Sequence, residues 1–454
     1  MKLIKFFALL FFVSLIHFSC KKEDPTPPGD DGTTYTQYGT PFADVPATAD
    51  IVMYEVNLRA FSQGGNLQGV IDRLDELKAL GTNVIWLMPI YPIGQVNSVN
   101  SPYSVKDYKA VSPEYGTLES LQTLTDEAHA RGMAIVLDWV ANHTSWDNAW
   151  IENKTWYTQD ASGNIIHPAG TNWMDVADLN FANTNMREAM IDAMEYWVFE
   201  ANVDGFRCDY ADGVPFDFWK QAIDELRSAP DRQLIFLAEG DRSDHYAAGF
   251  DMTYGWSFYG AVKSVFGGSS AGNLYLTHNS EYSGIPSGKQ KLRFTTNHDE
   301  SAWDKTPMVL FNGKKGALAA SVMTIFMGGV PLFYTGQEVG RTSNVPFFSN
   351  SPINWNDNPD MLQAYQEIMA FYTQSEAAKT GTNTHYSDPK VVCFKKVSGN
   401  ESLLVMVNAR NSQSSFSLPA ALQNTSWTNA LTGEITELGS SLTLENYQYL
   451  LLTQ

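Results

Sequence analysis

The sequence predicts an α/β chain in which eight parallel strands and their connecting helices close into a barrel. From about residue 51 to residue 340, short β-branched or aromatic runs alternate with longer segments of helical period, which is the pattern of βαβ units. The number of runs fits a closed barrel, and several of them end in acidic residues. The runs span residues 51–56, 84–87, 134–137, 203–208, 234–238, 250–254, 292–296 and 330–334.

The N-terminal residues predict export. Lysines at positions 2 and 5 precede an apolar run over residues 6–18, so residues 1–19 have the layout of a signal peptide. Ser19 followed by Cys20 resembles a bacterial lipoprotein signal, which implies a lipid on Cys20 as the only membrane contact. Residues 20–49 are rich in proline, glycine and acids and predict a flexible tether. We expect an envelope-anchored protein at the outer membrane or cell surface, with simple secretion as the alternative.

The rest of the chain divides into three parts. The barrel is expected over residues 50–375 and carries an inserted loop domain at residues 143–178, because that stretch is too long for an ordinary connection. Short alternating strands predict a C-terminal antiparallel β-sandwich over residues 376–454. The remaining cysteines, Cys208 and Cys393, fall in different predicted domains, so we expect both to be buried without a disulfide.

Composition limits the class of partner. The chain has 454 residues, a formal net charge of -20 and a sequence pI near 4.7. A chain of this length exceeds one core of about 250 to 300 residues. Its charge repels nucleic-acid backbones and anionic membrane surfaces. A neutral ligand is therefore favoured, and the sequence does not decide the oligomeric state.

Four of the runs are followed by acidic residues at their C-terminal ends: Asp138, Asp209, Glu239 and Asp299. The C-terminal rim of such a barrel is where catalytic side chains converge. Any single acid there is explained equally well as a cap of the following helix. The recurrence of acids at four strand ends favours a common site.

The period of a strand indicates how two of these acids are tuned. Arg207 and Asp209 are two residues apart, so they share a face of their strand, and the guanidinium is expected to favour the ionised carboxylate of a nucleophile. Glu239 follows an apolar run and faces other acids across the barrel mouth. Burial and like charge should raise its pKa, which suits a proton donor.

Five short motifs follow one another along the barrel, at residues 138–143, 177–180, 205–209, 238–240 and 294–299. Their order and spacing resemble the α-amylase family of glycoside hydrolases, family 13-like. The resemblance covers nearly all of the chain from residue 51, and it implies the (β/α)8 or TIM barrel with its inserted loop and C-terminal sandwich.

The resemblance implies an α-amylase-type enzyme that cleaves α-1,4-glucosidic bonds in starch-like polysaccharides or oligosaccharides. Asp209 would attack the anomeric carbon, Glu239 would act as acid and base, and Asp299 would stabilise the transition state. Carboxyl groups about 5 to 5.5 Å apart permit a covalent glycosyl-enzyme and retention of configuration. The same resemblance places further residues on the sugar: Tyr103, His143, Arg207 and His298.

No cofactor is expected for the chemistry itself, and a structural calcium ion is an open alternative. Asn142 and Asp178 match two residues that hold calcium in many family members, while other members lack the metal. Oxygen donors of this kind suit calcium.

One departure leaves the specificity open. Many starch-cleaving members carry Lys-His three and four residues after the nucleophile, where this chain has Asp212 and Gly213. Activity on cyclodextrin, pullulan or α-1,6 bonds and transglycosylation are therefore alternatives. A further alternative from another class is a non-catalytic protein that binds surface glycans, although the intact trio of Asp209, Glu239 and Asp299 disfavours it.

Overall fold

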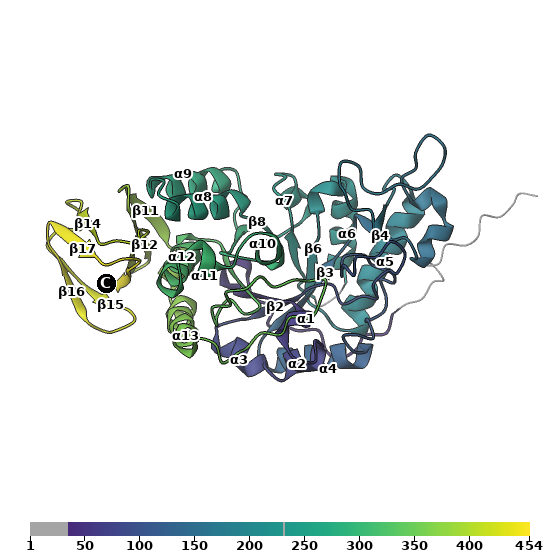
Figure 1. Cartoon of the computed structure of the whole chain (residues 1–454), viewed down its shortest axis with the longest axis horizontal. Helices are drawn as coiled ribbons and strands as arrows, with labels where there is room; N and C mark the ends of the chain where they lie inside the picture. The colour runs from purple at the N-terminus through teal and green to yellow at the C-terminus, as the bar shows by residue number, and fades with distance from the viewer. Residues whose placement is uncertain (1–34, 230–231) are drawn as a thin grey trace, which may run out of the picture.

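The computed structural model describes residues 35–229 and 232–454. Figure 1 shows the barrel in the middle of the molecule, with the C-terminal strands at one end and the strand β4 of the insertion toward the other. The predicted signal peptide of residues 1–19 and the lipid attachment at Cys20 lie outside the described residues.

A closed barrel of eight parallel strands confirms the predicted fold class. The strands follow one another around the barrel in the order β1, β2, β3, β6, β7, β8, β9 and β10, and β10 pairs with β1 to close it. Their bounds are β1 (Met53–Val56), β2 (Val84–Leu87), β3 (Ala134–Trp139), β6 (Gly205–Cys208), β7 (Ile235–Ala238), β8 (Met252–Tyr254), β9 (Gln290–Arg293) and β10 (Val330–Tyr334).

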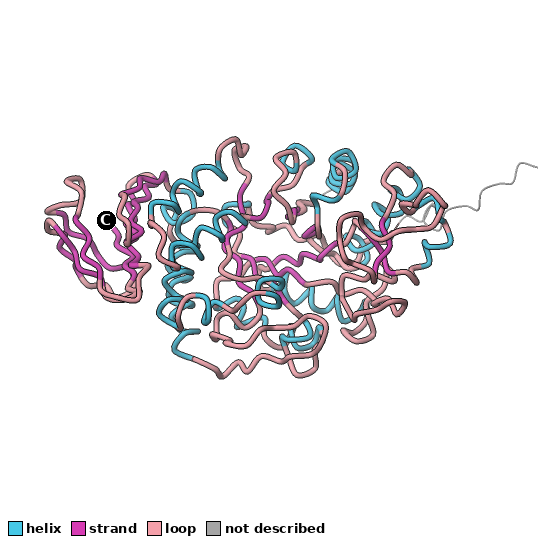
Figure 2. The backbone as a smooth tube through the Cα atoms, turned by 45° about the horizontal axis from the view of Figure 1, so that its top comes forward, coloured by secondary structure: helices cyan, strands magenta, loops and turns pink. Residues whose placement is uncertain are grey.

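Helices surround the strands, as the cyan and magenta segments of Figure 2 show. They are α1 (Leu58–Phe61), α2 (Leu67–Ile71), α3 (Leu74–Ala79), α4 (Leu118–Ala130), α5 (Thr184–Glu200), α6 (Phe216–Arg227), α7 (His245–Ala248), α8 (Trp256–Phe266), α9 (Gly272–Tyr282), α10 (His298–Trp303), α11 (Pro307–Leu310), α12 (Lys314–Met327), α13 (Pro359–Gln374) and α14 (Glu376–Thr380).

Strand alternation divides the core into two layers. Side chains such as Met53, Trp86 and Leu237 belong to one buried cluster inside the barrel. Their neighbours in sequence, such as Ile85 and Phe236, belong to a second cluster that packs against the helices. This division follows from the period of two, and it leaves inward positions at the C-terminal rim for polar side chains.

Gly205 begins β6 where the barrel leaves no room for a side chain. Its φ is +147°, and a Cβ atom there would lie 2.0 Å from the carbonyl oxygen of Ile235 in the adjacent strand β7. Only glycine tolerates both conditions. The residue therefore lets β6 pair closely with β7, and these two strands carry the nucleophile and acid/base candidates at their ends.

The insertion after β3 is a small antiparallel ribbon with irregular loops. It contains β4 (His143–Ser145), η2 (Ala149–Glu152), η3 (Lys154–Trp156) and β5 (Val176–Asp178). His143 pairs with Asp178 and Ser145 with Val176.

Two antiparallel sheets follow the barrel and share one buried core. In the larger sheet the order is β11, β12, β13, β18, β15 and β16, and β14 pairs with β17 in the smaller sheet. The strands are β11 (Thr382–Tyr386), β12 (Val391–Ser398), β13 (Glu401–Asn408), β14 (Ser414–Ser417), β15 (Thr425–Asn429), β16 (Ile435–Leu438), β17 (Ser441–Leu444) and β18 (Tyr449–Thr453). Cys208 in the barrel and Cys393 in β12 are both buried and free, as expected.

Residues 35–50 run against the barrel before its first strand and end in the short helix η1 (Thr48–Asp50). We call them the N-terminal strap. The side-chain amide of Asn202, three residues before β6, donates to the carbonyl of Thr40 at 2.8 Å. The ring of Phe42 stacks on His129, near the end of α4, with 4.4 Å between centroids. Part of the segment with tether-like composition thus contacts the N-terminal side of the barrel.

The seventh strand differs from its predicted position. The apolar run at residues 292–296 predicts a strand that ends at Thr296, but β9 spans Gln290–Arg293. Lys291 and Arg293 are buried with polar partners, so the strand lacks the apolar pattern that marks the other strands. Within the described ranges, no helix is both long and apolar enough to cross a membrane.

Candidate active site

A cleft of about 940 Å³ opens at the C-terminal ends of the barrel strands. The three predicted catalytic carboxyl residues, Asp209, Glu239 and Asp299, all line it. Three of the four predicted sugar-binding residues line it as well: Tyr103, His143 and His298. Cavities of this volume accommodate ligands as large as a short oligosaccharide.

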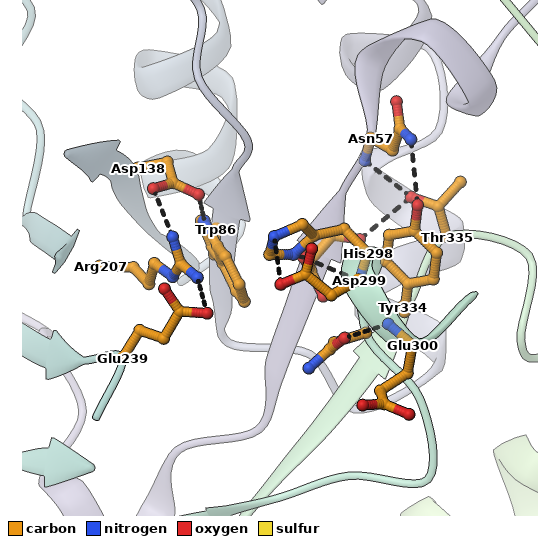
Figure 3. A network of polar contacts seen from close by, with 12 residues as sticks. Asn57, Trp86, Asp138, Arg207, Glu239, His298, Asp299, Glu300, Tyr334 and Thr335 are labelled. Atoms are coloured by element: carbon orange, nitrogen blue, oxygen red, sulfur yellow. Dashed lines mark hydrogen bonds and ion pairs between the residues drawn. The ribbon is translucent and has the colours of Figure 1, made fainter. Parts of the chain in front are cut away.

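Arg207 lies beneath the cleft and links three acids. Its Nη1 is 2.9 Å from Oδ1 of Asp138 and 3.0 Å from Oδ1 of Asp209. Its Nη2 is 2.9 Å from Oε1 of Glu239. Figure 3 shows the guanidinium between Asp138 and Glu239. The planar, always charged side chain of arginine suits such bridging, and here it fixes the acids of β6 and β7 relative to each other.

Asp138 is the least accessible of these acids and supports the others. The indole N–H of Trp86 donates to its Oδ2 at 3.1 Å, and the hydroxyl of Tyr103 donates to the same oxygen at 3.0 Å. Nε of Arg207 donates to the hydroxyl of Tyr254 at 3.1 Å. With Asp138 and Tyr254 held in place, Arg207 has little freedom to turn away from the cleft.

Burial controls the charge of the two central carboxyl groups. It raises the pKa of Asp209 above its usual range, because the single guanidinium is shared among three acids and only partly opposes the loss of solvation. The adjacent arginine therefore does not by itself produce the low pKa that its position in the sequence suggests. The pKa of Glu239 is raised by burial and, despite Arg207, further by the charges of Asp209 and Asp299.

A backbone donor holds the side chain of Glu239. The N–H of Tyr210 donates to Oε2 of Glu239 at 2.7 Å. Tyr210 has a φ of 41°, in the left-handed region that few non-glycine residues adopt. This conformation directly follows Asp209, so the turn after one central carboxyl residue contacts the side chain of the other.

His298 lies between Asp299 and Glu55, a buried acid of β1. Its Nδ1 is hydrogen-bonded to Oε1 of Glu55, and its Nε2 lies 2.9 Å from the hydroxyl oxygen of Tyr103 and 3.4 Å from Oδ2 of Asp299. Burial opposes a charge on the ring, but the carboxylates of Asp299 and Glu55 outweigh it and raise the pKa of His298 to about 9. The ring is therefore protonated at neutral pH and can donate from both nitrogens.

His143 has a different state. Burial lowers its pKa to about 4, so the ring is neutral at ordinary pH. Its ring lies edge-on to Trp173 of the insertion, with 5.6 Å between centroids. The insertion thus contributes one wall of the cleft. Aromatic side chains from α8, α10 and the loop after β10 also line it: Trp256, Trp303, Phe347 and Phe348.

Sequence reasoning did not single out Glu55 or these aromatic side chains. Glu55 is an acid inside the apolar run of β1, and that interruption is a signal that could have marked it. Trp303 ends the short helix α10 with 66% of its surface exposed, and nothing in its local sequence distinguishes it from a packing residue.

Comparison with known proteins identifies the family to which this barrel and its cleft belong. The family profile for the α-amylase catalytic domain matches residues 36–253. The crystal structure of an α-amylase from Lactobacillus plantarum superimposes with a TM-score of 0.80 and 30% sequence identity, over 90% of this chain and 99% of that one. The chain belongs to the α-amylase family of glycoside hydrolases.

Curated members of the α-amylase family are similar in sequence to this protein along most of its length. The α-amylase MalA of Haloarcula japonica is 26% identical over 427 residues, which cover 87% of this chain and 62% of MalA. A cyclomaltodextrinase of Thermoanaerobacter pseudethanolicus is 24% identical over 378 residues, which cover 77% of this chain and 64% of that protein. The chain thus spans less than two thirds of both proteins, and members of the family that resemble it have differently named activities.

The residues that the α-amylase family resemblance assigns to calcium lie next to each other but form no complete site. Asn142 precedes β4 and Asp178 ends β5, and the N–H of Leu179 donates to the carbonyl of Asn142 at 3.1 Å. Calcium is usually bound by about six to eight oxygen atoms. The side chains of Asn142 and Asp178 would supply two of them. In the part of the chain that the structure describes, no group of three or more His, Cys, Asp or Glu side chains could hold a metal ion. Calcium at this place stays a prediction.

Proposed function

We propose that the protein is a retaining glycoside hydrolase that cleaves α-1,4-glucosidic bonds in starch-like polysaccharides or oligosaccharides. The observation that carries this proposal is the placement of Asp209 and Glu239 on the two amino groups of one guanidinium, that of Arg207, at the floor of a cleft. A nucleophile and a proton donor held by one rigid group are what a double displacement needs.

In the first step the carboxylate of Asp209 attacks the anomeric carbon, while protonated Glu239 gives its proton to the departing glycosidic oxygen. The raised pKa of Glu239 keeps that proton available, and burial supplies most of the shift. In the second step the carboxylate of Glu239 takes a proton from water, which attacks the glycosyl-enzyme and releases Asp209. Retention of configuration follows from the two inversions.

Asp299 and His298 would hold the sugar during both steps. Asp299 lines the cleft beside protonated His298, so a carboxylate and a charged donor face the same place. Hydrogen bonds of this kind, which strengthen as the sugar distorts toward an oxocarbenium ion, stabilise the transition state. Tyr103 presents a ring to the cleft that could stack on the apolar face of a sugar.

Linkage and mode of action form the finer part of the proposal. Relatives named as cyclomaltodextrinase and oligo-1,6-glucosidase favour testing cyclodextrin and α-1,6 bonds beside starch. The mature protein should be incubated with starch, pullulan, cyclodextrin and isomaltose, and the products followed by NMR with detection of the first-formed anomer. Release of α-anomeric maltosaccharides from starch is expected. A β-anomer first would contradict retention, and binding of starch without any released sugar would favour the glycan-binding alternative.

We also propose export and anchoring through a lipid on Cys20. The support is the sequence around Ser19-Cys20, which resembles a lipoprotein signal. In the native host, Cys20→Ser is expected to shift the protein from the membrane fraction to the soluble fraction, and incorporation of a labelled fatty acid should disappear with it. Protection of the intact protein from protease added to whole cells would contradict a location at the cell surface.

A further inference from the structure

The two segments that directly follow Asp209 and Glu239 in the chain are hydrogen-bonded to each other at the C-terminal rim of the barrel. The first is the turn at residues 210–213, which includes η4 (Ala211–Gly213) and follows Asp209. The second is the segment at residues 240–242, which follows Glu239. The N–H of Ala211 donates to the carbonyl of Glu239 at 2.9 Å, so the backbones join directly after the two carboxyl residues.

Asp212 provides most of the remaining contacts between the turn and the segment. Its Oδ2 accepts from the N–H of Asp241 at 3.1 Å, and its Oδ1 accepts from the N–H of Arg242 at 3.3 Å. Nε2 of His245, which is fully buried in α7, lies 2.7 Å from the same Oδ1. In return, Nη1 of Arg242 donates to the carbonyls of Asp212 and Val214, each at 2.9 Å.

The carboxylate of Asp212 fits closely against the residue that follows Glu239. A Cβ atom added to Gly240 would lie 2.2 Å from Oδ1 of Asp212. Partial burial opposes the charge of Asp212, but hydrogen bonds from His245 and the two backbone N–H groups outweigh it and hold the pKa below its usual range. Asp212 is therefore an anionic acceptor at neutral pH, held by three donors although 39% of its side chain is exposed at the edge of the cleft.

The same turn contacts the side chain of Glu239. The N–H of Tyr210 donates to Oε2 at 2.7 Å from a backbone in the left-handed region. Such a conformation persists when surrounding contacts impose it. Two residues later, Asp212 supplies contacts that fix the turn to the 240–242 segment.

We propose that Asp212 is a positioning residue for Glu239: it fixes the 240–242 segment against the 210–213 turn, so that the proton donor meets the glycosidic oxygen in the correct orientation. The inference rests on the proposed function of Glu239 as acid and base. It assigns a role to the position where many family members carry a lysine, and that role acts through the backbone after Glu239 and through no contact with sugar.

The proposal predicts which step suffers when Asp212 is removed. A poor leaving group such as a sugar needs the proton of Glu239, whereas fluoride departs with little protonation, so kcat/KM on a maltosaccharide should fall more than kcat/KM on α-maltosyl fluoride. Asp212→Ala is expected to lower the first about tenfold or more and the second less than about threefold. Loss of the Tyr210 N–H from the carboxylate of Glu239 also removes stabilisation of its charged form.

The alkaline limb of the kcat/KM profile tests this second consequence, because it reports the proton that Glu239 must hold. The charged groups around Glu239 include Arg207, Asp209, Asp299, His298 and, across Arg207, Asp138, and the substitution leaves all five in place. The limb should therefore move to higher pH in Asp212→Ala, by about one unit. A role confined to folding or to sugar contact would leave it unmoved.

Two variants serve as controls for the experiment. Asp241→Asn removes another cleft charge from the same segment but keeps the backbone N–H that Asp212 accepts, so the ratio between the two substrates should stay as in the wild type. Gly240→Ala disturbs Asp212 from the opposite side and should reproduce the Asp212→Ala pattern, which covers the case that Asp212→Ala does not fold.

An equal fall on both substrates with an unmoved alkaline limb would overturn the proposal, as would a rise in KM alone. If the wild-type protein cleaves neither substrate, the proposed function fails, and a crystal structure of Asp212→Ala decides the inference separately. Oε2 of Glu239 is expected beyond hydrogen-bond distance of Tyr210 N in that structure. A side chain still within about 3.2 Å of Tyr210 N would overturn the inference.

Discussion

Arg207 and Asp209 share one face at the end of the same strand, with Nη1 of the arginine 3.0 Å from Oδ1 of the aspartate. The same guanidinium also contacts Asp138 and Glu239, so one positive charge is shared among three acids at the floor of the cleft. The charges of the three acids therefore depend on their contacts with Arg207. Substitutions of Arg207 and of its partners should change activity in ways that can be measured.

Asp209→Asn tests the nucleophile. We expect turnover to fall by at least about a thousandfold, because the amide keeps the size of the side chain but cannot attack the anomeric carbon. The melting temperature should stay close to that of the wild type. The matched control is Asp217→Asn, which neutralises an exposed carboxylate paired with Arg187 and should leave kcat unchanged. Comparable activity in Asp209→Asn and the wild type would remove Asp209 from the mechanism.

Arg207→Lys tests the shared cation. A single ammonium group cannot bridge acids on opposite sides of a planar fork, so we expect kcat/KM to fall about a hundredfold and the melting temperature to drop. In Arg131→Lys the change falls on a partly exposed residue, far from the cleft, that pairs with Asp75 and Glu127, and both kcat/KM and the melting temperature should stay unchanged there. If the two substitutions behave alike, the bridge in the cleft has no special importance.

The pH dependence should be bell-shaped, with both limbs displaced upward. Asp209 must be ionised, and burial raises its pKa. The acid limb, on which activity falls as Asp209 takes up a proton, should therefore lie at a higher pH than the ordinary carboxyl range near pH 4. Glu239 must be protonated, and its raised pKa carries the alkaline limb upward as well. Because the two carboxyl groups interact, the apparent pKa values of the two limbs describe the pair and not either residue alone. A profile of kcat/KM against pH with an alkaline limb near pH 4 to 5 would contradict this account.

Chelation tests the calcium prediction. Since Asn142 and Asp178 supply only two side-chain oxygens, we expect EDTA to leave the melting temperature unchanged within about 1 °C. The measurement is a thermal melt before and after dialysis against the chelator. A fall of several degrees that calcium restores, and that Asn142→Ala abolishes, would establish the ion.

The sequence predicted what depends on local period and strand ends. The barrel and the shared face of Arg207 and Asp209 follow from alternation, which needs no knowledge of distant contacts. The link between Glu55 and His298 could not be foreseen, because these residues lie 243 positions apart and meet only when β10 closes the barrel onto β1. The pKa of Asp209 also escaped prediction, since the strand ends bring the acids to one rim but do not reveal that three of them share the guanidinium of Arg207.

The N-terminal strap has a consequence for access. It contacts Asn202 and His129, which precede β6 and β3, whereas the cleft opens beyond the other ends of those strands. At its start, the hydroxyl of Tyr35 donates to Asp192 in the middle of α5 at 2.6 Å and accepts from Nζ of Lys109 in the loop after β2, so the strap runs from the flank of the barrel to its N-terminal side. The strap contributes no residue to the lining of the cleft, so a long polymer that enters the mouth meets the loops of the barrel and the insertion.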